Sequence, residues 1–305
     1  MFRKIILIAG PTASGKSKIA ISIAKKIKGE IINADSMQVY KEFSILTSRP
    51  DKKDLKKIKH HLYGFVPVKN HFSTGHWLRK VKNKIINLNS KKKTPIIVGG
   101  TGLYFNCILK GLSKIPSISS KKRLKIRLYH KKIGQKKFYN LLIKKDPLCK
   151  GKFDKTDIQR TLRAYEVKHY TKTSLYEWFK NTKSDFKDYN IKKIFINTPK
   201  SQLLKNISNR VDQMIKKGCF DEVRNFRRLK INKALSANKI IGISEISDFL
   251  NKKTDINQLK EKILIKTRQY AKRQKTWSRG HMSDWNMIYH KNTSVLIKKV
   301  LKLVS

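Results

Sequence analysis

The chain has 305 residues and is 39% hydrophobic, which excludes a mainly disordered chain and is enough to form a core in one large domain or two ordinary ones. Its 72 Lys and Arg residues against 20 Asp and Glu residues give a formal charge of +52, more than an ordinary solvated surface needs. Such an excess favours a polyanionic partner such as nucleic acid, with AT-rich codon drift as the alternative source of the bias.

The cysteines and the N-terminus exclude further classes. Cys107, Cys149 and Cys219 lie far apart and form no CxxC pair, so neither a zinc site nor a disulfide framework is predicted. About five apolar residues precede Pro11, too few for a signal peptide or a membrane span. We therefore expect a cytoplasmic protein with no membrane partner, and nothing implies a protein partner.

Short apolar runs alternate with segments of helical periodicity. Strands are predicted at 4–10, 30–36, 94–100 and 192–199, and helices at 17–27 and about 75–90. This alternation predicts an α/β fold, with a parallel sheet covered by helices on both faces.

The character of the chain changes after the third strand. Residues 113–190 contain helical, strongly basic segments, and "SKIPSISS" at 113–120 is the expected hinge. We expect two domains: a core of residues 1–112 and 191–305 that includes the C-terminal helices, and an all-helical insertion of residues 113–190.

A long helix is predicted at 257–279. One face carries Ile263, Thr267, Tyr270, Gln274 and Trp277, and the opposite face carries Arg268, Lys272, Lys275 and Arg279. The aligned cations fit a solvated face or a face that follows a phosphate backbone, and both interpretations stay open.

A phosphate-binding motif follows the first strand and opens the first helix. It matches G-x-x-x-x-G-K-[ST] with Gly10, Pro11, Thr12, Ala13, Ser14, Gly15, Lys16 and Ser17. Backbone N–H groups and the helix N-terminus would hold phosphate oxygens, and Lys16 would add a positive charge. The Ser17 hydroxyl suits Mg²⁺.

The strand before residue 100 lacks the acid that hydrolytic enzymes with this loop use for magnesium. It ends at Gly99, Gly100 and Thr101, and the only carboxylate that ends a predicted strand is Asp35. One acid beside a phosphate site suits proton removal from an acceptor better than ATP hydrolysis. Small kinases share this arrangement.

Five motifs in fixed order resemble the tRNA dimethylallyltransferase (tRNA isopentenyltransferase) family. They are GPTASGKS at 10–17, ADSMQVY at 34–40, VGGTGLY at 98–104, DIQRTLRAYEV at 157–167 and TRQYAKRQKTW at 267–277. The resemblance implies a P-loop NTPase-like core and transfer of a dimethylallyl group from dimethylallyl diphosphate to the N6 amine of the adenosine adjacent to the tRNA anticodon. The phosphate loop would then hold the diphosphate leaving group with Mg²⁺.

The resemblance also implies roles for single residues. Asp35 would accept the proton of the amine, and the Thr101 hydroxyl would bond the leaving group or the base. Arg210 would help to hold the diphosphate, with a surface cation as the alternative. Gly99 and Gly100 would leave space for a ligand to approach the backbone.

For the anticodon stem-loop, the resemblance implies contacts in both domains and an adenosine that is flipped out of its stack. The implied tRNA-binding residues are Asp35, Ser36, Met37, Gln38, Thr101, Arg123, Gln159, Arg160, Thr161, Leu162 and Arg163. For Arg123 a solvated face is the alternative.

The chain departs from the family pattern in two places. Residues 46–50 read LTSRP where Gly-Thr-Ala-Lys-Pro is usual, and Ile243 and Ser244 replace a usual Tyr and a basic residue. Three other functions stay open: a nucleotide kinase, an RNA-binding protein without catalysis, and an enzyme that prenylates free adenine nucleotides. The basic insertion argues against the first and third, and Asp35 with Thr101 argues against the second.

Overall fold

The computed structural model describes residues 3–289 and 292–304, and the chain divides into two compact units. The core unit comprises Met1–Asn106 and Asp188–Ser305, and the helical unit comprises Cys107–Lys187. The sequence placed the insertion at 113–190. Each unit has its own buried cluster of hydrophobic side chains and is described by itself.

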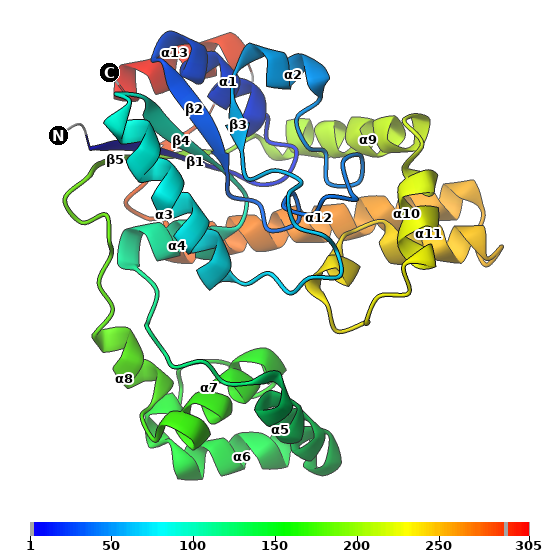
Figure 1. Ribbon diagram of the computed structural model, residues 1–305. Coiled ribbons are helices and arrows are strands. Elements are labelled where there is room, and N and C mark those ends of the chain that lie inside the picture. The colour runs from blue at the N-terminus through cyan, green and yellow to red at the C-terminus, as the bar shows by residue number, and fades with distance from the viewer. Residues whose placement is uncertain (1–2, 290–291, 305) are drawn as a thin grey trace. The chain divides into compact units, whose positions relative to one another are not determined.

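The core unit contains a six-stranded parallel sheet in the order β3-β2-β4-β1-β5-β6 (Figure 1). The strands are β1 (Lys4–Ala9), β2 (Gly29–Asn33), β3 (His60–His61), β4 (Thr94–Gly99), β5 (Asn190–Ile196) and β6 (Asn286–Ile288). The predicted α/β fold with a parallel sheet is confirmed. The sequence missed β3 and β6, which are too short to show a period.

Strand β1 lies at the centre of the sheet and is buried on both faces. Ile6 and Ile8 belong to the cluster under α1 (Lys16–Lys26) and α13 (Thr293–Val304), while the alternate residues Ile5 and Leu7 point to the other face. Ala9 pairs with Gly99 of β4, so the turns that follow these two strands leave the sheet side by side. This edge, at the carboxyl ends of the strands, is where open α/β sheets bind ligands.

The remaining helices of the core unit cover the sheet and extend beyond it. They are α2 (Lys52–Lys57), α3 (Thr74–Ser90), α9 (Lys200–Lys216), α10 (Cys219–Arg228), α11 (Ile243–Leu250) and α12 (Ile256–His281), together with the first half of α4 (Gly102–Lys110), which continues into the helical unit. Helices α9 to α12 enclose a second cluster that includes Val39, Tyr40 and Phe43 from the segment after β2. This cluster fixes the chain that leaves β2 next to α12.

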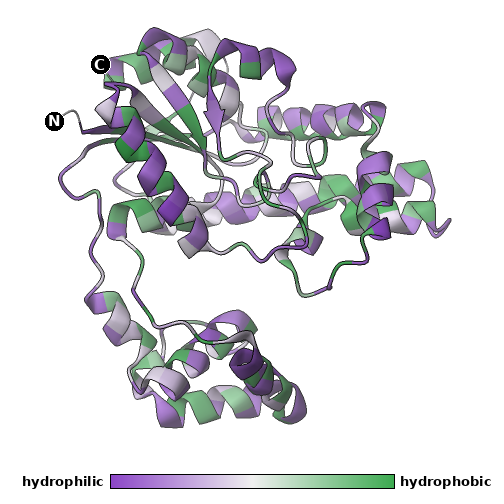
Figure 2. Cartoon of the chain, viewed as in Figure 1, coloured by the Kyte–Doolittle hydropathy of each residue, from purple (hydrophilic) through white to green (hydrophobic). Residues whose placement is uncertain are grey.

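The helical unit contains α5 (Ser120–Ile133), α6 (Gln135–Lys145), α7 (Ile158–Thr171) and α8 (Leu175–Lys180). Hydrophilic residues recur between hydrophobic ones along α5, α6 and α7 (Figure 2). Phe138, Leu142, Cys149 and Tyr165 are among the residues that form the buried cluster of the unit. Its helices are therefore amphipathic, with one side packed and the other charged.

All three cysteines are buried and form no disulfide. Across residues 3–289 and 292–304, no helix combines the length and the apolar character that crossing a membrane requires.

Candidate active site

The phosphate loop, residues 10–17, connects β1 to α1. A Cβ on Gly10 would lie 2.8 Å from the Ser14 hydroxyl and 2.9 Å from the Ile196 carbonyl oxygen, so only glycine fits the loop against β5. Gly15 has φ 81°, a left-handed conformation that glycine adopts readily, and α1 begins at the next residue. The first amides of α1, at Lys16 and Ser17, therefore face outward from a helix N-terminus, where anions bind.

Side chains from distant elements fix the phosphate loop. The Gln274 side chain on α12 accepts a hydrogen bond from the Thr12 amide (2.8 Å) and donates one to the Gly100 carbonyl (2.9 Å). Asn206 on α9 donates to the Ala13 carbonyl (3.0 Å), and Thr198 donates to the Ser14 carbonyl (3.1 Å). The sequence placed Gln274 on the buried face of its helix but gave no sign that it joins the loop to the end of β4.

Two cations and one carboxylate converge on the loop. Arg210 on α9 donates to the Thr12 hydroxyl (2.8 Å), and the Lys16 ammonium donates to the Pro11 carbonyl (3.1 Å). Burial lowers the pKa of Lys16 to about 8, with Asp35 opposing this change and Arg210 adding to it. Burial also lowers the pKa of Arg210, which Asp35 opposes. Both cations are thus poorly hydrated and lie close to Asp35, which prepares them for an anionic ligand.

Asp35 lies two residues after β2, in a turn that its own side chain stabilises. Its Oδ1 accepts a hydrogen bond from the Met37 amide (2.9 Å), and its amide donates to Asn33 Oδ1 (2.8 Å). This is an Asx turn, and no helix follows Asp35 directly. Burial and the charge of Asp35 both raise the pKa values of Tyr63 and Tyr270, whose rings are near the carboxylate.

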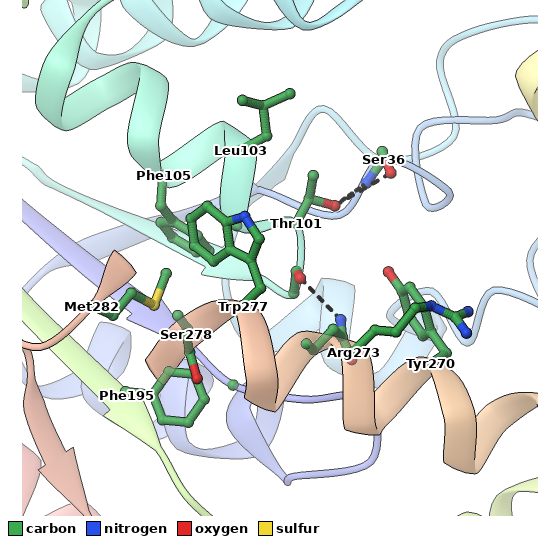
Figure 3. A pocket seen from close by; sticks show the side chains of 15 residues that line it. Ser36, Thr101, Leu103, Phe105, Phe195, Tyr270, Arg273, Trp277, Ser278 and Met282 are labelled. Atoms are coloured by element: carbon green, nitrogen blue, oxygen red, sulfur yellow. Dashed lines mark hydrogen bonds between the residues drawn. The ribbon is translucent and has the colours of Figure 1, made fainter. Parts of the chain in front are cut away.

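Thr101 connects the segments that follow β2 and β4. Its hydroxyl accepts a hydrogen bond from the Ser36 amide (2.9 Å) and donates one to the Ser36 hydroxyl (3.3 Å), and its amide donates to the Ala34 carbonyl (3.1 Å). Figure 3 shows the Thr101–Ser36 pair on one side of an apolar pocket. Thr101 is therefore hydrogen-bonded to Ser36, the residue that directly follows Asp35 in the chain.

Gly99 lines the phosphate cavity and Gly100 lines the apolar cavity described below, so the expectation that they let a ligand approach the backbone stays a prediction. A Cβ on Gly99 would overlap the backbone of Ala34, and one on Gly100 would overlap the side-chain amide of Gln274. Next to them, a Cβ on Gly102 would overlap the ring of Trp277. These glycines let the segment after β2 and helix α12 approach the end of β4, which is a second, structural reason for glycine at these positions.

Three cavities surround Asp35 and Thr101. The phosphate cavity (about 480 Å³) contains the loop with Asp35, Gln38, Tyr63 and Arg210 in its wall. The polar cavity (about 290 Å³), which we name for the Asp35 carboxylate and the Arg210 guanidinium in its wall, is also lined by polar groups of Ser36, Thr47 and Tyr270. Apolar side chains also line its wall: Met37, Leu46, Met214, Ile240 and Ile241. The apolar cavity (about 310 Å³) is lined by Ser36, Thr101, Leu103, Phe105, Trp277 and Met282, among others (Figure 3). Asp35 and Arg210 line the first two, and Ser36 and Tyr270 line the last two, so the three adjoin.

The residues expected to bind tRNA fall in both units. In the core unit Ser36 and Met37 line the polar cavity, and Gln38 lines the phosphate cavity. In the helical unit Gln159 and Arg160 are exposed on α7. Thr161 and Leu162 are buried in the core of that unit, because they lie on the opposite side of the same helix.

Arg123 and Arg163 lie on either side of one buried carboxylate. Glu166 is 3% exposed and lies 3.7 Å from Arg123, 3.9 Å from Arg127 and 3.8 Å from Arg163. Burial raises the pKa of Glu166, and the three guanidinium groups oppose this change. The sequence showed the arginines but not the carboxylate between them.

The departures from the family pattern have structural explanations. Leu46 is buried and packs against Gly242, where a Cβ would lie 2.7 Å from it, and Ser48 takes the left-handed conformation of that segment (φ 50°). Ile243 is buried at the start of α11. Lys266 donates to the Ser244 hydroxyl (3.2 Å), so a cation lies beside that serine.

Comparison with known proteins decides the family. The family model described as IPP transferase matches residues 38–281. The chain belongs to the IPP transferase family. The phosphate loop and Asp35 precede the matched residues, so their assignment depends on the geometry above and on full-length relatives.

Curated relatives are similar to this chain over nearly its whole length. A tRNA dimethylallyltransferase of Pelagibacter ubique (strain HTCC1062) is 54% identical over 299 residues, which covers 98% of this chain and 96% of the relative. One from Ehrlichia canis (strain Jake) is 41% identical, with 92% and 93% covered. The 299 residues compared with the first of these relatives are enough to include the loop and Asp35.

Solved structures with a fold similar to that of this chain include two transferases. The full-length tRNA isopentenylpyrophosphate transferase of Bacillus halodurans matches with a TM-score of 0.70 and 26% identity, covering 98% of this chain and 95% of the other. A eukaryotic dimethylallyltransferase, described as acting on tRNA, matches with a TM-score of 0.82 and 27% identity. That match covers 96% of this chain and 75% of the other.

Proposed function

We propose that this IPP transferase moves a dimethylallyl group from dimethylallyl diphosphate to the N6 amine of the adenosine adjacent to the anticodon of tRNA. The observation that supports this most directly is the position of Asp35. Asp35 lines both the phosphate cavity, where we propose that the diphosphate binds, and the polar cavity, where we propose that the acceptor binds. The names of the relatives indicate the same activity.

The diphosphate would bind at the phosphate loop. The amides at the start of α1 and the ammonium of Lys16 would neutralise its oxygens, and Arg210 would add a second cation from α9. Because burial removes part of the water around both cations, a diphosphate that binds there would displace less water from them. The negative charge that develops on the leaving group would therefore be stabilised by two cations that are already in place.

Magnesium fits this site with few protein ligands. Among the described residues no group of three or more His, Cys, Asp or Glu side chains could hold a metal ion. Mg²⁺ commonly binds through one or two protein oxygens together with phosphate oxygens and water, and the Ser17 hydroxyl at the helix N-terminus suits that role. When bound, Mg²⁺ would stabilise negative charge on the departing diphosphate.

The transfer itself exchanges one bond for another. The C1–O bond of dimethylallyl diphosphate breaks as the N6–C1 bond forms, the electron pair leaves with the diphosphate, and the N6 proton passes to the Asp35 carboxylate. The Met37 amide holds Oδ1 of Asp35, which fixes the direction of the carboxylate. The Thr101 hydroxyl, which lies next to Ser36, would bond the bridging oxygen or the base.

The remaining surfaces suit the other parts of the substrates. The apolar cavity next to Thr101 has aromatic and aliphatic walls that exclude water from a reactive allylic carbon (Figure 3). An adenosine can reach the polar cavity beside Asp35 only when it is flipped out of its stack. Arg123, Gln159, Arg160 and Arg163 of the helical unit would contact the anticodon arm, mainly through phosphates.

Incubation with dimethylallyl diphosphate, Mg²⁺ and unmodified tRNA or AMP tests the proposal. We expect mass spectrometry to show one added dimethylallyl group on an adenosine of tRNA and none on AMP. In Asp35→Asn the amide oxygen still accepts from Met37 while the proton acceptor is lost, so we expect kcat to fall by about 10³-fold or more.

The matched control is Asp212→Asn, the same change on an exposed residue of α9 that pairs with Lys260. It should keep wild-type kcat. ATP turnover without any prenylation would contradict the proposed function, and full activity of Asp35→Asn would contradict the role of Asp35.

A further inference from the structure

One carboxylate outside the cavities organises part of their wall. Glu222 on α10 accepts four hydrogen bonds from a segment about 180 residues earlier in the chain. Its Oε1 accepts from the Ser44 amide (2.7 Å), the Ser44 hydroxyl (2.9 Å) and the Ile45 amide (2.7 Å), and its Oε2 accepts from the Leu46 amide (3.0 Å).

Three successive amides that converge on one anion form a backbone nest. The 44–48 loop therefore takes its shape around the charge of Glu222 and not around a regular secondary structure. The neighbouring Asp221 does not take part. It is exposed and pairs with Arg224 of its own helix.

The 44–48 loop in turn holds a residue of the site. The side-chain amide of Gln38 donates to the Thr47 carbonyl (2.9 Å) and to the Ser48 carbonyl (3.0 Å). Thr47 lines both the phosphate cavity and the polar cavity, and Gln38 lines the phosphate cavity. A change in the loop would thus move Gln38 and also Thr47, which lines the same two cavities as Asp35.

We propose that Glu222 is a positioning residue for tRNA recognition, which acts through the 44–48 loop on Gln38 without contacting substrate. The proposal rests on the proposed function of the site. Glu222 is absent from the walls of the three cavities described above, so its effect has to pass through the loop. The loop at residues 10–17 is held by side chains of α9 and α12, so its own geometry should not depend on Glu222.

The first test is Glu222→Gln. The substituted amide places an N–H group among three N–H donors, so the nest loses its anion and gains a repulsive contact. We expect the KM for tRNA to rise about tenfold, while the KM for dimethylallyl diphosphate stays within about twofold of the wild type. Hydrogen exchange at the amides of Ser44, Ile45 and Leu46 should become faster.

Asp221→Asn is the matched control, because it removes one charge from the adjacent position of the same helix and leaves the nest intact. Its KM for tRNA should equal that of the wild type. Equal rises in both KM values of Glu222→Gln, or no rise in either, would overturn the proposal. Because wild-type turnover is measured in the same assay, a wild-type protein without prenylation would reject the proposed function instead.

A double-mutant cycle separates positioning from general stability. If Glu222 acts through Gln38, the change in KM for tRNA in Glu222→Gln/Gln38→Ala should equal that of Gln38→Ala alone to within about twofold. Independent, multiplicative effects would overturn the proposal. Should Glu222→Gln not fold, Glu222→Asp takes its place in the cycle, because it keeps the charge and shortens its reach.

Discussion

The phosphate loop of the core unit and the arginine cluster of the helical unit both present cations, but they are built differently. In the core unit, Arg210, Asn206 and Gln274 are fixed by hydrogen bonds of 2.8–3.0 Å to the loop. In the helical unit, Arg123 and Arg163 lie 3.7–3.8 Å from Glu166.

The arginine cluster also leaves donors unused. Among the described residues, Arg123 Nε and Arg163 Nη1 are buried nitrogens with no hydrogen-bond partner. The two guanidinium groups are close enough that Arg123 adds to the effect of burial in lowering the pKa of Arg163. The difference indicates two tasks: a reaction requires one fixed geometry, whereas a hold on a phosphate backbone requires mainly charge.

Added salt should weaken binding at the two sites to very different extents, and this is the greatest change that we predict for this comparison. If six or more phosphates are contacted, tRNA affinity should fall about 10³-fold between 50 and 200 mM salt, because phosphate contacts release counterions. The affinity for dimethylallyl diphosphate, held by fixed groups in a cavity, should fall far less. Filter binding over a salt series measures the first and isothermal calorimetry the second. A flat response for tRNA would show that the charge of the helical unit is compositional drift.

A matched pair of Arg→Lys changes tests at which of the two sites positive charge alone is enough. Arg210→Lys keeps the charge but loses the fork that bonds Thr12, so we expect kcat/KM to fall about 10- to 100-fold. Arg163→Lys also keeps the charge, and where charge suffices the loss should be about threefold or less. Steady-state kinetics with saturating tRNA for the first variant and varied tRNA for the second gives both values. Equal losses would remove the distinction between the two sites.

The smallest expected effect concerns pH and the core unit alone. Burial lowers the pKa of Lys16 to about 8, so Lys16 is charged below pH 8 and neutral above it. A bound diphosphate favours the charged form and raises this pKa, so binding above pH 8 requires proton uptake. Affinity for dimethylallyl diphosphate should therefore be constant below pH 8 and weaken by up to about tenfold per pH unit above it.

Lys16→Arg provides the control, since arginine stays charged throughout this range. Its affinity is expected to be lower but independent of pH between about 7 and 9.5. The same slope above pH 8 in both proteins would show that another group titrates.

Much of the fold follows from local patterns. The apolar runs at β1, β2, β4 and β5 and the motif at residues 10–17 predict the strands, the first helix and the phosphate loop, because period and glycine placement are local properties. Strands β3 and β6 were missed since two or three residues carry no period. Gly99 and Gly100 were identified as special positions, but their packing against Ala34 and Gln274 could not be predicted from the sequence.

A single sequence is enough to identify a phosphate-loop motif, the residues Asp35 and Thr101 after two strands, and a resemblance to a family. Which of these residues are in contact depends on the tertiary structure. Gln274 bridges the phosphate loop and β4, Glu222 holds residues 44–46, and Glu166 lies between arginines. These contacts join residues brought together by packing, and a single sequence records the identity of such partners but not their proximity.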